Sequence, residues 1–386
     1  MSEISVALIR AKYNPFGGAE RFVQTALTAL REKSVRLTVL TRQWPHGATS
    51  DINHVILNPR YLTSTGRDRG FARAVSEHLA THRYDLVQSH ERIVGCDLFR
   101  AGDGVHAAWL AERSRVMDGF RRLGIRLNPH HRYLLATERE MFLSPKLRAV
   151  ICNSQMVRDD ILKHFDIDPS KLHVILSGVD STRFSPTLRE EFRDATRAKL
   201  RIPKAAPVAL YVGSGFERKG LVGFLTGLAE LTAHGTLRRE SVRGIVVGHD
   251  KHLRRYQAFA DQLGLIDRVA FVGGVDDVRP YYAAADIFAL PTLYDPLPNA
   301  CLEAMACGLP TITSTRSGAA ELIADGVEGF VTDALDTPAI ADSMRKAFDD
   351  AGMGARARNR VSKLTPSAMA DAYVNLYRDL LFGNAA

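Results

Sequence analysis

The sequence has little cysteine, no long apolar run and no repeating period, and each absence excludes a class of protein. Its four cysteines in 386 residues are too few for a disulfide scaffold and lack the paired spacing of a metal site. No apolar run reaches the ~18 residues that span a bilayer. The N-terminal apolar stretch stops at Arg10, so it predicts a first strand and not a signal peptide. The sparse cysteines predict a reducing cytosol. The composition, 46% hydrophobic and 24% charged, is typical of a globular protein, and the length predicts two domains.

The positive charge gathers in the first half of the chain. Residues 1–180 hold 26 basic and 19 acidic residues, whereas residues 181–386 hold 25 and 24, for a net charge of +8. The densest basic stretch, 113–148, has nine basic and three acidic residues interleaved with apolar ones. A basic face beside apolar residues is typical of attachment to an anionic membrane, and equally of a solvated helix. No nucleic-acid-binding module accompanies the charge, so we expect no nucleic-acid partner.

Short apolar strands alternate with amphipathic helices along the chain, which predicts parallel sheets built from βαβ units. A first series of strands is expected at 4–10, 35–41, 53–57, 85–89 and 148–152. A second series begins near residue 207, and its strands repeatedly end in glycine, which leaves room for a ligand at the carboxyl edge of a sheet. We therefore expect an α/β fold with two Rossmann-like domains, 1–177 and 178–365, facing each other across a cleft. A C-terminal segment, 366–386, is expected to form a helix that packs back across the boundary.

A glycine-rich turn follows the first strand of each domain. Gly17 and Gly18 let backbone N–H groups approach a ligand ahead of a helix N-terminus, although a tight turn needs such glycines anyway. In the second domain, the turn from Gly213 carries Arg218 and Lys219 at a helix start, where two cations oppose the helix dipole. An anion such as a diphosphate would resolve that conflict, and a solvated pair of cations is the alternative. The spacing of a P-loop is absent.

Two acids eight residues apart form the most informative pattern. Asp295 precedes a helix that is expected to begin near Pro298, and Glu303 falls inside that helix on a face otherwise apolar. A carboxylate in that position needs a partner, because an unpaired buried charge is costly. The two hydroxyls of a ribose would serve, and a structural salt bridge is the alternative.

These segments, in this order, resemble the family-four retaining glycosyltransferases over nearly the whole chain. The likeness is carried by Gly17-Gly18-Ala19-Glu20-Arg21, Gly178-Val179-Asp180, the turn from Gly213 to Gly220, and the acid-x7-acid pattern of Asp295 and Glu303. More narrowly, Pro15-Phe16-Gly17-Gly18, the 95–103 segment, Arg218-Lys219-Gly220 and the 247–251 segment resemble the lipopolysaccharide core glucosyltransferase I subgroup.

The resemblance implies a GT-B fold and a nucleotide-sugar donor held mainly by the second domain, with no cofactor and no metal. It assigns catalysis to Asp103, facing the acceptor, to Arg218 and Lys219, holding the diphosphate, and to Asp295, holding hydroxyls of the transferred sugar. Glu303 would hold the ribose. The residues that it assigns to substrate binding are Gly17, Gly18, His106, Gly213, Val275, Leu297, Asn299, Ala300 and Glu303.

The same subgroup implies a lipopolysaccharide core or related glycolipid as the acceptor, and its membrane-contact region matches the basic stretch 113–135. The expected function is therefore transfer of a hexose with retention, glucose from UDP-glucose in the first place. The enzyme would be peripheral, on the cytoplasmic face of the inner membrane. Asp295 departs from the family pattern, in which the first acid is usually Glu, and leaves other donor sugars open.

Three alternatives stay open: transfer onto another cell-surface glycan, a nucleotide-sugar epimerase on the same fold, and a binder without catalysis. The chain also contains Asp166-Ile167-Asp168, which mimics a metal-binding acid pair. It lies in an expected helix-to-strand connection, so we interpret it as a surface coincidence.

Overall fold

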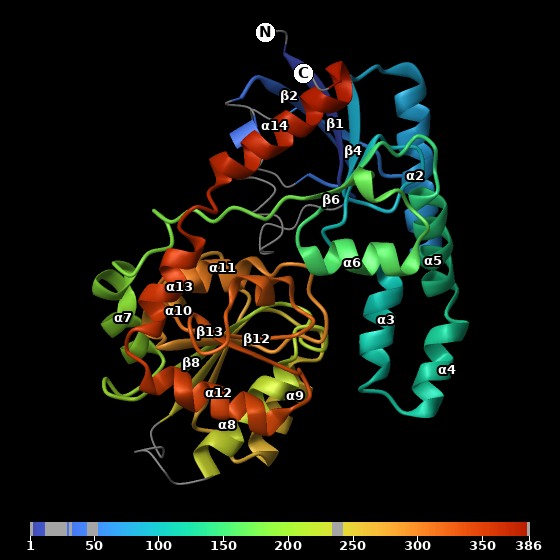
Figure 1. Cartoon of the computed structure of the whole chain (residues 1–386). Helices are drawn as coiled ribbons and strands as arrows, with labels where there is room; N and C mark the ends of the chain where they lie inside the picture. The colour runs from blue at the N-terminus through green and yellow to red at the C-terminus, as the bar shows by residue number, and fades with distance from the viewer. Residues whose placement is uncertain (1–2, 12–28, 31–32, 45–52, 234–241, 384–386) are drawn as a thin grey trace. The chain divides into compact units, whose positions relative to one another are not determined.

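The computed structural model describes residues 3–11, 29–30, 33–44, 53–233 and 242–383 (Figure 1). The chain forms two compact units. The first holds the described residues up to Leu176 together with 366–383, and the second holds those from Ser177 to Thr365. Gly17 and Gly18 lie outside the described residues.

A seven-stranded parallel sheet forms the centre of the first unit. Its strands are β1 (Ile4–Ile9), β2 (Val35–Thr41), β3 (Asn53–Ile56), β4 (Leu86–Ser89), β5 (Leu98–Arg100), β6 (Ala149–Cys152) and β7 (Leu172–Val174). Their order is β3-β2-β1-β4-β5-β6-β7, with Ile4 opposite Val35 and Val6 opposite Leu86. The order reverses between β1 and β4, and the crevice at such a reversal is where open α/β sheets bind ligands.

Helices cover this sheet and extend beyond it. They are α2 (Ser64–Thr81), α3 (His106–Ser114), α4 (Gly119–Leu127), α5 (Pro129–Phe142), α6 (Gln155–His164), the short 3-10 helix η1 (Pro169–Lys171) and α14 (Pro366–Phe382). Two side-chain caps divide the basic stretch: Asp118 begins α4, and Asn128, followed by a proline, begins α5. The basic stretch 113–135 is therefore the end of α3, all of α4 and the start of α5, not one helix.

The last helix of the chain, α14, belongs to the first unit (Figure 1). Its apolar face, with Met369, Tyr373 and Tyr377, joins the buried cluster to which β1, β2, β4, β5 and β6 contribute. The Tyr377 hydroxyl donates to Oε1 of Gln88 on β4 at 2.7 Å, and Nε of Arg100 on β5 donates to the Tyr373 hydroxyl at 3.0 Å. Residues far apart in the sequence thus complete one core.

The second unit has a six-stranded parallel sheet in the order β10-β9-β8-β11-β12-β13. Its strands are β8 (Val208–Val212), β9 (Arg243–Val247), β10 (Val269–Gly273), β11 (Ile287–Leu290), β12 (Thr311–Ser314) and β13 (Gly329–Thr332). Its helices are α7 (Leu188–Lys199), α8 (Leu221–Ala233), α9 (Leu253–Gln262), α10 (Arg279–Ala284), α11 (Asn299–Ala306), η3 (Gly318–Leu322), α12 (Thr337–Asp349) and α13 (Met353–Val361). The order reverses between β8 and β11, as in the Rossmann arrangement.

The expected α/β class and the two Rossmann-like sheets are confirmed. Two strands, β5 and β7, were not predicted, because each is three residues long and too short for a periodic signal. Five helices, α3, α4, α7, α12 and α13, were also not predicted, and the sequence of α7, LREEFRDATRAK, is mostly charged. Its Arg193 and Arg197 bind Asp286, just before β11, at 2.6 Å and 2.8 Å, so ion pairs help to attach this helix to the sheet.

Candidate active site

Two loops meet at the reversal point of the second sheet. One follows β8, from Gly213 to Gly220, and the other follows β11, from Pro291 to Pro298. The Arg218 carbonyl in the first loop accepts the N–H of Leu293 at 2.9 Å and the hydroxyl of Thr292 at 2.7 Å in the second. The backbone therefore holds the predicted cations of one loop beside the predicted acid of the other.

Glycine at two positions of the first loop permits this close approach. Gly220 has φ +73°, and a Cβ there would coincide with the Pro291 carbonyl oxygen. At Gly213, a Cβ would lie 3.2 Å from Cγ of Lys219, whose stem runs over this glycine. The predicted substrate-binding residue Gly213 thus makes room for the predicted catalytic lysine.

The predicted catalytic groups Lys219 and Asp295 form an ion pair through Nζ and Oδ2. Asp295 is buried, with 6% of its surface exposed, and its carbonyl accepts the N–H of Gly318 at 2.8 Å. Arg218 donates from Nε to the Tyr294 carbonyl at 2.9 Å, and its guanidinium lies over the Tyr294 ring. The structure therefore brings together three of the four residues assigned to catalysis.

Helix α11 supplies the second acid. Glu303 is 7% exposed, and its Oε2 accepts the hydroxyl of Tyr282 on α10 at 2.8 Å. Tyr282 is fully buried, and its hydroxyl is also 3.2 Å from the Ala300 carbonyl. The partner expected for the Glu303 carboxylate therefore includes the Tyr282 hydroxyl, from another helix. The sequence around Glu303 gave no sign of the position or the residue type of this partner.

The remaining predicted substrate-binding residues of this loop, Leu297, Asn299 and Ala300, lie at the start of α11. Leu297 is buried just before the helix, Asn299 is its first residue, and the Pro298 cap contributes no side-chain hydrogen bond. The first turn of a helix exposes N–H groups and a partial positive charge, which favour an anion. Val275 is partly exposed in the loop after β10, at the same edge of the sheet but beyond β9.

The predicted acceptor residue Asp103 is exposed on the loop between β5 and α3 of the first unit. That loop is held by an ion pair between the partly exposed Arg92 and the buried Glu138 on α5, because Arg92 donates from Nε to Glu138 at 2.8 Å and from Nη2 to the Gly104 carbonyl at 2.9 Å. Both Glu138 oxygens also accept the N–H of His106 at 3.0 Å. Sequence reasoning missed Arg92 and Glu138, although Glu138 follows Leu134 at helical spacing on a buried face.

Titratable groups surround this loop. Burial raises the pKa of the Glu91 carboxyl, Arg10 opposes that shift, and the nearby Asp103 charge adds to it. Nε2 of the buried His106 lies 3.1 Å from Nδ1 of His131, and burial, followed by Arg113, lowers the pKa of His131. The buried His106 is therefore held at its backbone N–H by Glu138 and at its ring by His131.

Asp166 and Asp168 stand apart from both groups. Oδ1 of Asp168 accepts the N–H of Ser170 at 2.9 Å and caps η1. No cluster of three His, Cys, Asp or Glu side chains with metal-site geometry occurs in the ranges that the structure describes. None of the helices described there is long and apolar enough to cross a membrane.

Two family models match the chain. Glycosyltransferase Family 4 matches residues 16–183, and Glycosyl transferases group 1 matches residues 192–364. The chain belongs to these glycosyltransferases, and its two Rossmann-like domains are those of the GT-B fold.

Two glycosyltransferases of lipopolysaccharide synthesis are similar to this chain over most of their length. The chain is 28% identical to the lipopolysaccharide glucosyltransferase WaaG of Escherichia coli (strain K12) over 329 residues, which is 84% of each protein. It is 26% identical to the lipopolysaccharide core biosynthesis glycosyltransferase LpsE of Rhizobium meliloti (strain 1021), over 93% of this chain and 95% of LpsE. A crystal structure of WaaG superposes with a TM-score of 0.82 at 25% identity, over 98% of this chain and all of that one. The protein is thus a glycosyltransferase related to enzymes of lipopolysaccharide synthesis.

Proposed function

We propose that this glycosyltransferase moves a hexose, with glucose and UDP-glucose favoured, from a nucleotide sugar to the core of lipopolysaccharide. The observation that carries the proposal is the convergence of Arg218, Lys219 and Asp295 at the reversal point of the second sheet. The likeness to an enzyme named lipopolysaccharide glucosyltransferase supports both the sugar and the acceptor. A neighbour of the same fold, Anabaena HepE, was crystallised with UDP and glucose, at a TM-score of 0.72 and 18% identity.

In this proposal the cations bind the diphosphate of the donor. Lys219 contributes a point charge and Arg218 a planar fork of N–H donors, and the first turn of α11 adds its partial positive charge. Glu303 accepts hydrogen bonds from the ribose hydroxyls, while Tyr282 orients its carboxylate. Asp295, already beside Lys219, accepts from hydroxyls of the hexose.

The chemical step breaks the bond between the anomeric carbon and the diphosphate oxygen and forms a bond to an acceptor hydroxyl on the same face. The anomeric carbon passes through an oxocarbenium-like state. Negative charge builds on the departing diphosphate, which takes the proton of the acceptor hydroxyl. Lys219 and Arg218 stabilise that charge without a metal ion, as positioned electrostatic groups. Asp103 faces the acceptor.

Replacement of Lys219 by Ala tests the assignment of the diphosphate site. Loss of one positioned charge-stabilising donor lowers turnover by about 10²–10³, and we expect that loss without loss of the fold. Lys204→Ala is the matched control, because Lys204 is exposed and pairs only weakly with Asp194. Turnover of K219A close to that of K204A would remove Lys219 from the reaction.

The donor is identified by heat stability. A ligand that binds only the native state raises the melting temperature, by an amount that grows with its concentration over Kd. Among nucleotide sugars, UDP-glucose is expected to protect most, and its protection should fall in K219A. Product formed from the donor alone, with no acceptor, would favour the epimerase alternative. Turnover with another glycan, but none with lipopolysaccharide core, would show that the proposed acceptor is wrong.

We also propose that α4 attaches the enzyme to the cytoplasmic face of the inner membrane. Phe120, Leu123 and Leu127 lie at helical spacing and are 92%, 54% and 64% exposed, beside the exposed Arg121 and Arg122. An exposed apolar face flanked by arginine fits the interface of an anionic bilayer.

Vesicle sedimentation tests this attachment. Phe120→Ser removes the most exposed ring, and burial of such a side chain is worth about 1.5–3 kcal/mol, so binding to phosphatidylglycerol vesicles should weaken about tenfold or more. Leu62→Ser, at another fully exposed apolar residue of the same unit, is the control. Equal binding by both variants would remove α4 from the membrane interface.

A further inference from the structure

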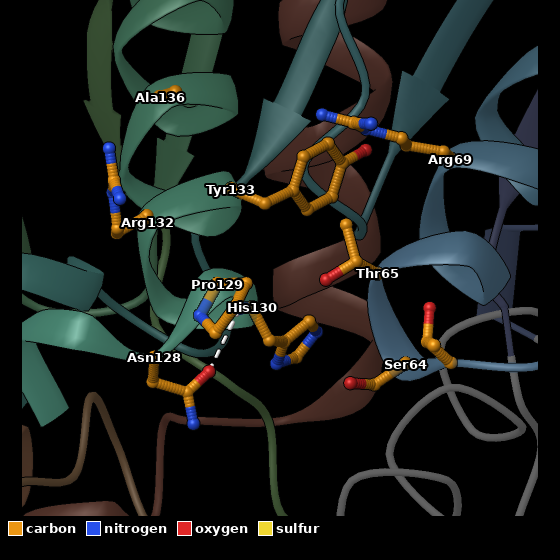
Figure 2. A pocket seen from close by; sticks show the side chains of 10 residues that line it. Ser64, Thr65, Arg69, Asn128, Pro129, His130, Arg132, Tyr133 and Ala136 are labelled. Atoms are coloured by element: carbon orange, nitrogen blue, oxygen red, sulfur yellow. Dashed lines mark hydrogen bonds between the residues drawn. The ribbon is translucent and has the colours of Figure 1, made fainter. Parts of the chain in front are cut away.

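A hollow between α2 and α5 in the first unit has no role in the function proposed so far (Figure 2). Its volume is about 640 Å³, within the range of roughly 300–1,000 Å³ of small-molecule sites. It is lined from α2 and its N-cap by Thr63, Ser64, Thr65 and Arg69, and from α5 and its N-cap by Asn128, Pro129, His130, Arg132, Tyr133 and Ala136. The lining contains three basic side chains and, among the described residues, no acidic one.

The positive charge of the hollow centres on Arg69. Its guanidinium lies 5.1 Å from the centre of the Tyr133 ring, and Figure 2 shows the two side chains turned toward each other. Arg132 extends from the opposite side of α5 in the same view, so it is less directly placed. A guanidinium presents five N–H donors in a rigid fork, which suits a phosphate or a carboxylate.

Asp68, the acid that precedes Arg69 in the sequence, already has partners of its own. Asp68 accepts from Nε of Arg67 at 2.7 Å and pairs with Nε2 of His130 at 2.8 Å. Burial raises the pKa of Asp68, but the hydrogen bonds from Arg67 and His130 outweigh burial and lower it. Asp68 therefore stays ionised and fixes the His130 ring at the edge of the hollow, while Arg69 keeps its charge for a ligand.

The remaining lining suits a saccharide. Ser64 and Thr65 bring hydroxyl groups, Asn128 an amide and Tyr133 an aromatic ring, which together match the hydroxyls and apolar faces of a sugar. The hollow also adjoins the loop of Asp103. His131, next to His130, bonds to His106 at 3.1 Å, and His106 begins α3 three residues after Asp103.

We propose that this hollow binds an anionic saccharide unit of the acceptor, with its phosphate or carboxylate on Arg69 and its hydroxyls on Ser64 and Thr65. The inference rests on the proposed transfer to a glycan acceptor and adds a specificity determinant to it. It predicts that the enzyme selects acceptors by a charged group some distance from the hydroxyl that receives the hexose.

The test compares Arg69→Gln with Arg73→Gln in the full chain. Arg73 is one turn further along α2, carries the same charge, is 83% exposed and lies outside the hollow. Both variants are assayed with lipopolysaccharide core oligosaccharide in three forms: intact, treated with phosphatase, and reduced at its carboxylates. A charged hydrogen bond contributes about 1.5–3 kcal/mol, so KM for the intact acceptor should rise about 10- to 100-fold in R69Q. R73Q should match the wild type.

The treated acceptors identify the anion. For the wild type, KM should rise when the anionic group that binds Arg69, either phosphate or carboxylate, is removed from the acceptor. R69Q should have the same KM for the acceptor that lacks this group and for the intact acceptor. Equal KM values for R69Q and R73Q with the intact acceptor would overturn the inference and leave the proposed function in place.

If no core acceptor is a substrate, the proposed function is overturned, but a binding measurement still tests the inference. Ligand-observed NMR with glucose 6-phosphate and glucuronate, against glucose, measures the preference for charge directly. We expect wild type and R73Q to prefer a charged sugar about tenfold over glucose, and R69Q to lose much of that preference. The same preference in R69Q and R73Q would overturn the inference by itself.

Discussion

The two units share a sheet topology but hold their functional carboxylates differently. In the second unit, Asp295 and Glu303 are buried and each is bonded directly, to Lys219 and to Tyr282. In the first unit, Asp103 is exposed, and the loop that carries it is held by the ion pair of Arg92 and the buried Glu138. One unit therefore positions its acids by their own contacts, and the other positions a backbone that presents an acid to solvent.

The difference fits the molecules that we propose each unit to bind. A nucleotide sugar is small and of constant shape, so a buried, fully bonded set of groups suits it. A glycolipid acceptor is larger and enters from a membrane surface, so it meets an exposed acid on a rigid loop. Three variants, each with a control variant, test how far the comparison holds.

The largest effect is expected from Gly220→Ala, which attacks the junction of the two loops in the second unit. A Cβ there would overlap the Pro291 carbonyl oxygen, at a φ of +73° that L residues rarely adopt. We expect a loss of about 3–5 kcal/mol in the free energy of unfolding, measured by urea denaturation.

Gly264→Ala separates overlap from backbone strain. Gly264 has nearly the same φ, +72°, and nothing lies within 4 Å of the position that a Cβ would take there. This variant should lose only about 1–2 kcal/mol. Similar losses for the two variants would show that the contact between the loops is not tight.

A smaller effect is expected from Glu138→Gln, which attacks the support of the Asp103 loop. The partly exposed Arg92 would lose its counter-charge, at a cost of about 2–3 kcal/mol in the free energy of unfolding. Because the loop moves, KM for the acceptor should rise while KM for the donor stays constant. Glu140→Gln, at an exposed position on the same helix, is the control. Equal changes in the two KM values would contradict a positioning role.

The smallest effect is a pH dependence at the reversal point of the first sheet. The Tyr377 hydroxyl donates to Gln88, so the Gln88 amide N–H points to Nε2 of His90, which accepts it at 2.9 Å. Burial, aided by Arg100 and Arg10, lowers the pKa of His90 well below 6.5. The stability contributed by neutral His90 is complete above its unfolded pKa and is lost as the pH falls from about 6.5 toward the lowered folded pKa.

Urea denaturation of His90→Gln between pH 7.5 and 5 measures this contribution. The wild type should lose up to about 1.4 kcal/mol per pH unit more than the variant below pH 6.5, since one proton is involved. His252→Gln, at an exposed histidine, should keep the slope of the wild type. Parallel slopes for wild type and H90Q would mean that His90 does not titrate on unfolding.

Much of the fold followed from local signals. Apolar runs that end in glycine predicted strands of the second unit, such as β8 before Gly213. The spacing of Met369, Tyr373 and Tyr377 predicted α14. The sequence also placed Glu303 on a buried helix face that required a partner. Helix α7, in which most residues are charged, and the three-residue strands β5 and β7 gave only weak local signals, so they were missed.

The side-chain contacts of the site were beyond local signals. Lys219 and Asp295 are 76 residues apart, and Tyr282 and Glu303 are 21 apart, so only the folded sheet brings each pair together. Glu138 lies between Leu134 and Met141 at helical spacing, which was a usable sign of burial, but its partner Arg92 comes from 46 residues earlier.

The place of α14 has a consequence for the order in which the protein is made. The ribosome synthesises β1 to β7 first, yet the core of that sheet includes Met369, Tyr373 and Tyr377. Every residue of the second unit emerges before these side chains do. The core of the N-terminal sheet therefore stays incomplete until α14 has been made, and the unit made in between is the first that can finish folding.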